Sequence, residues 1–167
     1  ARGYRFPGGR VLRPRRLILH SIIGASLHKR WFPWLMRPRL IRRLIQRLVA
    51  ASWMQPIWER RLFRQREAIP ADLRRQFFAD YGRCAAFPVF FDLITVDWYR
   101  RTRDKIQTEQ PVLLWGGKER VVSARYLELW RADLPQATIE LVPDWDHFPM
   151  LDAPADFSRK FVTLVTE

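Results

Sequence analysis

A carboxylate and a histidine each follow a short apolar run in the last third of the chain. Glu119 comes after residues 111–115 and a pair of glycines, and His147 comes after residues 138–142 and a short turn. A carboxylate bonded to an imidazole orients the ring and stabilises its charged form, so that the imidazole can act as a general base. The residues therefore predict an acid–histidine pair, provided that the two apolar runs are neighbouring strands.

Other interpretations of these residues remain open. Asp144 and Asp146 lie closer to His147 along the chain and compete with Glu119 for the role of the acid. Glu119 has a basic residue on each side, so it could be a solvated turn carboxylate. His147 could equally be a loop histidine that bonds to a neighbouring carboxylate.

Strand and helix patterns indicate how these residues are positioned. Residues 15–19 read as a short buried strand, and residues 111–115 and 138–142 read as two more. Between the last two, Ser123 can cap a helix. Its apolar side then carries Leu127, Trp130 and Leu134. A terminal helix is expected from apolar residues at i, i+4 and i+7, namely Phe157, Phe161 and Leu164.

The stretch from about residue 26 to residue 108 has a helical pattern, interrupted at Pro56 and Pro70. One of its helices has two apolar ridges at i, i+4 spacing: Leu40, Ile41, Leu44, Ile45, Leu48 and Val49. Arginines are expected opposite them: Arg39, Arg42, Arg43 and Arg47. We expect the ridges to pack inward and the arginines to face water. A later helix, over residues 88–103, contributes the aromatic residues Phe91, Trp98 and Tyr99, which either shape an apolar pocket or form the core.

The order of these features resembles the C-terminal portion of the α/β-hydrolase fold family. PVLLWGGKE at 111–119 and PDWDHFP at 143–149 are similar to the end of that family's core, which reads much like "PVLLxWGxxDxxV" and "xxxPxxGHFPxxExP". The resemblance implies the α/β fold class, with a partial hydrolase sheet of about three parallel strands and a large helical cap insertion. It divides the chain into a core strand segment at 1–25, a cap at 26–108 and a C-terminal core at 109–167.

The resemblance also implies catalytic roles for two residues. Glu119 would orient and stabilise the imidazole, and His147 would take a proton from a nucleophile and later activate water. The family's chain order is nucleophile, acid, histidine. Asp146 stands where the family usually has glycine, so the turn that presents His147 is expected to differ from the family pattern.

The nucleophile elbow of that family is not evident in this sequence. Ser21 is the candidate that comes nearest, but Leu19 and Ile23 occupy the two positions where G-x-S-x-G has glycine. Those glycines are needed because the sharp turn leaves no room for side chains. The sequence favours Ser21 as a residue just past a core strand, and it leaves Ser21 as an unusual nucleophile as the alternative.

The first functional interpretation is a hydrolase part. The chain would be the C-terminal part of an α/β-fold hydrolase that acts on a small or lipophilic substrate without a cofactor. It would be inactive alone, because the nucleophile belongs to an N-terminal half. A sheet that lacks its first strands presents an unpaired edge, so self-association is expected.

The second interpretation rests on charge. The 167 residues carry a net charge of +13, and residues 1–66 hold 17 Lys/Arg against one acid, Glu59. Trp31 and Trp34 precede the arginine-rich helix, a composition suited to an anionic membrane surface. The chain would then be a non-catalytic basic amphipathic module that docks on such a membrane or on a partner protein.

Other classes find little support in the composition. No nucleic-acid recognition module is visible. Three histidines and one cysteine lack metal-ligand spacing, so no metal is expected. No apolar run reaches the roughly 20 residues that span a bilayer. The single cysteine, Cys84, fits a reducing compartment, and we expect a cytoplasmic protein, either free or peripheral to the membrane.

Overall fold

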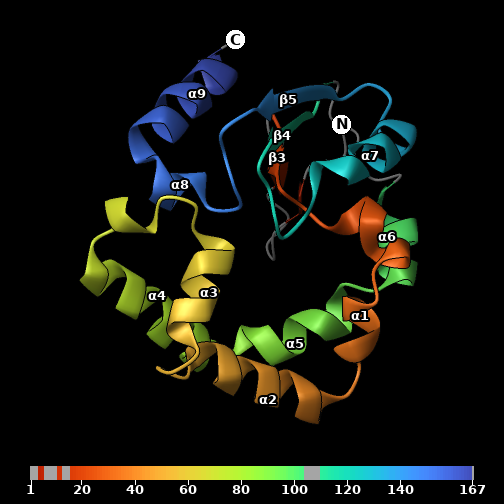
Figure 1. Cartoon of the computed structure of the whole chain (residues 1–167). Helices are drawn as coiled ribbons and strands as arrows, with labels where there is room; N and C mark the ends of the chain where they lie inside the picture. The colour runs from red at the N-terminus through yellow and green to blue at the C-terminus, as the bar shows by residue number, and fades with distance from the viewer. Residues whose placement is uncertain (1–3, 6–10, 13–15, 104–109, 167) are drawn as a thin grey trace.

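The computed structural model describes residues 4–5, 11–12, 16–103 and 110–166, and Figure 1 shows the arrangement of their helices and strands. In chain order the elements are β1 (Tyr4–Arg5), β2 (Val11–Leu12), β3 (Ile18–His20), η1 (Gly24–Lys29), α1 (Phe32–Leu35), α2 (Arg39–Ala50), α3 (Gln55–Leu62), η2 (Arg66–Ala68), α4 (Ala71–Arg83), α5 (Ala86–Leu93), α6 (Val96–Arg103), β4 (Val112–Gly116), η3 (Ala124–Tyr126), α7 (Leu127–Asp133), β5 (Thr138–Val142), α8 (Pro149–Asp152) and α9 (Pro154–Thr166). The η elements are short 3-10 helices.

Three parallel strands form the sheet that carries the site. Their order is β3-β4-β5, so β4 is the central strand. Ile18 pairs with Val112, and Val112 pairs with Thr138, both in parallel register. The carboxyl ends of parallel strands meet at one edge of a sheet, so the residues that follow the three strands come together there. The sheet confirms the predicted α/β class with about three parallel strands.

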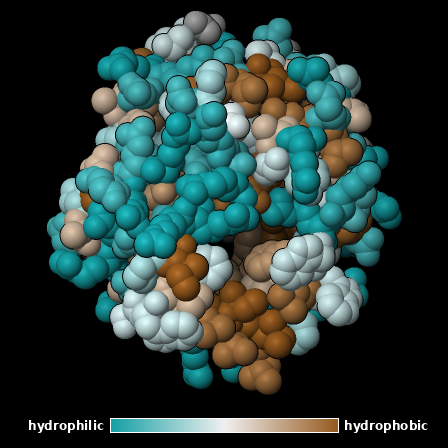
Figure 2. All heavy atoms as spheres, viewed as in Figure 1, coloured by the Kyte–Doolittle hydropathy of each residue, from teal (hydrophilic) through white to brown (hydrophobic). Residues whose placement is uncertain are grey.

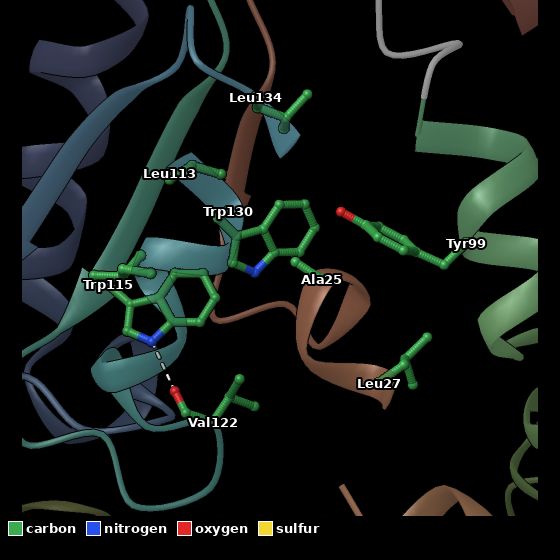
Figure 3. Packing of buried hydrophobic residues seen from close by; sticks show 9 residues of the cluster. Ala25, Leu27, Tyr99, Leu113, Trp115, Val122, Trp130 and Leu134 are labelled. Atoms are coloured by element: carbon green, nitrogen blue, oxygen red, sulfur yellow. Dashed lines mark hydrogen bonds between the residues drawn. The ribbon is translucent and has the colours of Figure 1, made fainter. Parts of the chain in front are cut away.

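One face of the sheet is covered by α7. Leu113 and Trp115 of β4 belong to a buried cluster with Trp130 of α7, and Figure 3 shows these side chains together. The Trp115 indole N–H donates to the Val122 carbonyl oxygen at 2.7 Å, which ties β4 to the turn before α7. Tyr99 of α6 meets Trp130 edge to face, with ring centroids 5.6 Å apart. Tyr99 is therefore a core residue and not part of an open pocket.

The other face of the sheet is covered by α9. Val112 and Leu114 of β4 form a second buried cluster with Trp145 and with Leu164 of α9, and Phe157 packs against it. All five residues of β4 are buried, as expected for a strand covered on both faces. The predicted terminal helix is confirmed by α9, although Phe161 on the same helix is exposed.

Residues 24–103, from η1 to α6, form what we call the helical segment, which lies between β3 and β4 in the chain. It has an apolar cluster of its own, with Val49, Phe63, Ile69 and Phe78 buried at its centre. Within it, α2 and α4 pack against each other, and the Gln46 amide of α2 donates to the Tyr81 carbonyl at the end of α4. The single helix expected over residues 88–103 is in fact two, because the chain is non-helical at Ile94–Thr95 between α5 and α6.

The expected orientation of α2 is wrong. Leu40 is 77% exposed and Leu44 is 50% exposed, whereas Arg42 is 3% exposed and Gln46 and Val49 are buried. Residues 42, 46 and 49 follow the helical period and define the inner face. Of the two predicted ridges, the one that contains Leu40 and Leu44 therefore faces water, and an arginine takes the inner position.

Hydrogen bonds explain why a guanidinium occupies this inner position. Arg42 Nη1 donates to the Pro88 carbonyl at 2.6 Å and to Asp92 Oδ1 at 2.7 Å, and Nη2 donates to the Arg37 carbonyl at 2.8 Å. Its Nε donates to the Met36 carbonyl. A buried charge is tolerated when its donors are satisfied, and here one side chain ties the start of α2 to α5. Hydrophobic periodicity alone does not show such a network.

We expect Arg42→Met to destabilise the chain by about 2 kcal/mol, because the backbone carbonyls and the Asp92 carboxylate that accept from Arg42 lose their donor. Urea denaturation followed by tryptophan fluorescence measures this loss. Arg43→Met is the matched control, since Arg43 is the exposed neighbour on the same helix. It should change stability by less than about 0.5 kcal/mol. Equal losses in both variants would contradict the buried role of Arg42.

Candidate acid–histidine site

Two glycines let the turn after β4 run alongside the turn after β5. The Gly117 N–H donates to the Val142 carbonyl at 2.8 Å, and the Lys118 N–H donates to the Trp145 carbonyl at 2.9 Å. A Cβ atom added to Gly116 would lie 2.3 Å from the Trp145 carbonyl oxygen, a distance that no side chain could adopt. Because both glycines leave room for this close approach, the two turns are held backbone to backbone.

The two turns bring Glu119 and His147 into contact. His147 Nδ1 lies 2.9 Å from Glu119 Oε2. Glu119 Oε1 accepts hydrogen bonds from the N–H groups of Val121 at 2.7 Å and Val122 at 2.9 Å. The Glu119 carboxylate is fully buried, while the His147 ring is partly exposed. Within the described residues, Nε2 of His147 makes no hydrogen bond, so this nitrogen is available to accept a proton.

The surroundings of Glu119 favour its charged form. Burial by itself raises the pKa of Glu119, but this effect is outweighed, and the pKa lies below its ordinary value of 4.5. The opposing causes are the hydrogen bond and charge of His147, the N–H of Val122 and the nearby hydroxyl of Ser21. A carboxylate that accepts from main-chain and ring donors is held in one orientation, which a partner of a histidine requires.

Among the described residues, neither competing aspartate forms a hydrogen bond with the histidine ring. Asp146 is buried and accepts from the Arg120 N–H at 3.0 Å, from Arg120 Nε at 2.6 Å and from the backbone N–H of His147 at 2.9 Å. Asp144 is exposed and lies 3.5 Å from an Arg64 nitrogen. The structure therefore places Glu119 beside the ring. Asp146, which replaces the glycine usual in the resembling family, instead fixes the turn through its own side chain.

His20 at the end of β3 was missed as part of the site. Its Nε2 lies 3.2 Å from the carbonyl oxygen of His147, and its Nδ1 lies 3.2 Å from that of Leu114. Burial lowers the pKa of His20, although both carbonyl contacts oppose this shift. A neutral imidazole can donate only one of these bonds. His20 thereby lies between the middle of β4 and the histidine turn. Its position at the end of β3 was the signal available in the sequence.

Ser21 lies next to the pair but is not bonded to the histidine. It is the one non-glycine residue with a positive φ, 44°, in the described part of the chain. This left-handed conformation is uncommon for a residue with a side chain. Its hydroxyl is buried near Glu119, yet Oγ has no hydrogen-bond partner of normal geometry among the described residues. The structure thus places Ser21 just past a core strand.

Residues that follow His147 in the chain also contact the helical segment. Phe148 packs edge to face on Phe77 of α4, with ring centroids 5.3 Å apart. Asp152 of α8 accepts from the backbone N–H groups of Arg64 at 3.1 Å and Gln65 at 3.3 Å. These contacts join the turn after β5 to the loop after α3, so the pose of His147 depends on both parts of the chain.

Two cavities lie beside the turn that carries His147, and a hollow is visible on one face of the molecule. Two cavities of about 540 Å³ flank the histidine turn, and Asp146 lines both, while neither is lined by His147 or Glu119. Figure 2 shows a hollow near the centre of the visible face, between a hydrophilic upper region and a more apolar lower region. In Figure 1 the same part of the view lies between the sheet and α5 of the helical segment.

The described residues offer neither a cluster of metal ligands nor a membrane-spanning helix. Within residues 4–5, 11–12, 16–103 and 110–166, no group of three or more His, Cys, Asp or Glu side chains could hold a metal ion. Among the helices in the same ranges, none combines the length and the hydropathy that crossing a bilayer requires.

Comparison with known proteins supports the fold. No protein-family model matches the chain, and no curated protein matches it in sequence. Solved structures do match it, each over 91% of this chain. A membrane phospholipase A described as a novel bacterial virulence factor matches with a TM-score of 0.60 and 18% identity, over 49% of its own length, and a candidate lipase from Acinetobacter baumannii AYE matches with a TM-score of 0.60 and 13% identity, over 52% of its length. A hydrolase from Pseudomonas aeruginosa PA01 matches with a TM-score of 0.56 and 15% identity, over 56% of its length.

At these identities the likeness concerns the fold alone. The mixed α/β architecture with its three-stranded parallel sheet matches α/β-hydrolase structures, as the sequence resemblance implied. The chain spans about half the length of the solved structures that it matches.

Proposed function

We propose that the chain supplies the histidine and the acid of an α/β-fold hydrolase, whose nucleophile comes from another segment of the protein. His147 acts as the general base and later as the general acid, and Glu119 orients it. The observation that carries this proposal is the 2.9 Å contact between His147 Nδ1 and the buried Glu119 carboxylate. No cofactor takes part in this chemistry.

The roles follow from the two ring nitrogens. With Nδ1 donating to Glu119, the lone pair of the neutral ring is on Nε2, which accepts the proton of the attacking nucleophile. The imidazolium that forms is stabilised by the carboxylate, and it returns the proton to the leaving group. In an acyl-enzyme pathway the same nitrogen then takes a proton from water.

The helical segment serves as the cap of this enzyme. The proposed substrate is a small or lipophilic ester, because the solved structures that match the chain include a phospholipase A and a candidate lipase. The segment supports this role because it lies between two core strands in sequence and contacts the histidine turn through Phe148 and Asp152. The hollow in Figure 2 occupies the part of the view where Figure 1 has the sheet on one side and α5 of the helical segment on the other.

The chain by itself is expected to show no nucleophile-dependent hydrolysis of p-nitrophenyl esters and no labelling by a fluorophosphonate probe. The reason is that the Ser21 hydroxyl, the nearest candidate, is buried and is not hydrogen-bonded to His147. Intact mass spectrometry after probe treatment measures the labelling, with Ser21→Ala as the companion variant. Stoichiometric labelling that is lost in Ser21→Ala would make Ser21 the nucleophile and contradict the proposal.

A second experiment uses a protein that is extended through the reading frame upstream of Ala1. The proposal requires a G-x-S-x-G sequence there. It also requires esterase activity of the extended protein that is lost in His147→Ala. An upstream frame without such a sequence, or activity that survives the substitution, would contradict the proposal.

A further inference from the structure

One face of α2 exposes apolar and cationic side chains next to each other. Leu40, Arg43, Leu44 and Arg47 are all exposed, and their spacing of i, i+3, i+4 and i+7 places them on one side of the helix. The opposite side is the one that packs inward through Arg42, as described above. A soluble surface helix usually presents polar residues here, so the two exposed leucines need an explanation.

The preceding helix extends this exposed apolar surface. Trp31 is 71% exposed and Trp34 of α1 is 68% exposed. Figure 1 shows α1 beside the start of α2, and Figure 2 shows that the region over α1, α2 and α5 is more apolar than the rest of the visible face. Large exposed apolar patches on a soluble protein commonly mark an interaction site.

The charged side chains that α1 and α2 themselves carry have a single sign. The chain has no acidic residue before Glu59, so α1 and α2 carry none. Within the described residues, Arg37, Arg43 and Arg47 are exposed and form no ion pair. These guanidinium groups are therefore available to an anionic partner.

We propose that this surface binds an anionic lipid membrane. We call it the α1–α2 surface and define it by the exposed residues Trp31, Trp34, Arg37, Leu40, Arg43, Leu44 and Arg47. Tryptophan and leucine enter the boundary between headgroups and acyl chains, while arginine binds lipid phosphate. In this orientation α2 lies parallel to the membrane. The inference is independent of the proposed hydrolase function, because no residue of the acid–histidine site takes part.

A membrane fits these observations better than a folded protein partner. The exposed face of α2 combines leucine with arginine and has no acidic residue, and Trp31 and Trp34 lie before it, a composition that suits an anionic membrane interface. Each arginine near an anionic bilayer strengthens binding by about fivefold at physiological ionic strength. Binding should therefore depend on both lipid charge and the leucines.

Flotation of the full chain with vesicles tests the proposal, because aggregated protein sinks while lipid-bound protein rises. Vesicles of phosphatidylcholine alone are compared with vesicles that contain about 30% phosphatidylglycerol. We expect binding to the anionic vesicles only, and weaker binding at high salt. Arg43→Gln/Arg47→Gln should lower the apparent affinity about 30-fold, and Leu40→Ser/Leu44→Ser about tenfold or more.

Matched controls use exposed residues elsewhere on the molecule. Arg75→Gln/Arg83→Gln on α4 removes two exposed arginines, and Val162→Ser/Val165→Ser on α9 removes two exposed apolar side chains. Both control proteins should float like the unmodified chain. Equal recovery with neutral and anionic vesicles would overturn the proposal, as would unchanged flotation of the α2 variants.

A different occupant of the surface would be visible in the same experiment. If the chain does not float and Leu40→Ser/Leu44→Ser disperses its oligomers in light scattering, the α1–α2 surface binds a second copy of the chain. That result would replace the membrane proposal.

Discussion

Replacing Glu119 with glutamine is expected to lower kcat for ester hydrolysis by about 10³- to 10⁴-fold in the protein form that carries the nucleophile. The amide oxygen can still accept from the Val121 and Val122 N–H groups, so the turn keeps its structure. The amide N–H₂ group then faces Nδ1 of His147 and forces the proton onto Nε2. An Nε2 that already carries a proton cannot act as the base.

The kinetic measurement needs a control that separates a positioning role from a general loss of charge. Glu128→Gln on α7 removes an exposed carboxylate whose nearest arginine nitrogen is 3.5 Å away. It should leave kcat unchanged. A Glu119→Gln protein that keeps kcat within about tenfold of the unmodified enzyme would contradict the role of Glu119.

The chain alone gives a second readout of the same substitution. The pKa of Glu119 is lowered on folding, so its stabilising effect is complete above the ordinary carboxyl pKa of 4.5 and is lost as the pH falls through the folded value. The stability difference between the chain and Glu119→Gln should therefore be largest near neutral pH and should shrink in acid. Urea denaturation between about pH 3 and pH 7 measures this trend.

Replacing Gly116 with alanine is expected to cost about 3 kcal/mol of stability or more, at the upper end of overpacking effects. The added Cβ would lie 2.3 Å from the Trp145 carbonyl oxygen and 3.1 Å from that of Asp146, and neither backbone atom can move away like a flexible side chain. The turn after β5 must shift, and His147 shifts with it. A displacement of about 1 Å at a catalytic group lowers the rate by about 100-fold.

Urea denaturation of the chain, and the esterase assay of the protein form that carries the nucleophile, measure these two effects of Gly116→Ala. The structure predicts that both fall together, because the same atoms hold the strand end and the histidine turn. Unchanged stability would show that the two turns are not in close contact, and it would contradict the described approach of Gly116 to Trp145.

The parts of the fold that follow local rules could be predicted. The apolar runs of β4 and β5, the Ser123 cap before α7 and the contact between Glu119 and His147 all follow from patterns within a few residues of each strand. Parallel pairing then brings the two turns to one edge of the sheet. The catalytic use of the pair remains a proposal.

The remaining features depend on partners that are distant in sequence. The burial of Arg42 depends on Pro88 and Asp92, about fifty residues away, and hydrophobic periodicity carries no information on them. On α4, likewise, the apolar residue Leu73 is exposed and Phe78 is buried at the centre of the packing. The contact between His20 Nε2 and the His147 carbonyl oxygen also joins residues that are distant in sequence.

The most direct test of the central claim is the protonation state of the His147 ring in the chain itself. Long-range ¹H–¹⁵N correlation NMR at a pH where the ring is neutral, with His147→Gln to assign the signals, identifies which nitrogen carries the proton. The contact with Glu119 predicts a proton on Nδ1 and a lone pair on Nε2, and it predicts the reverse in Glu119→Gln. A proton on Nε2 in the unmodified chain would contradict the assignment of His147 and Glu119 as the base and acid of a hydrolase.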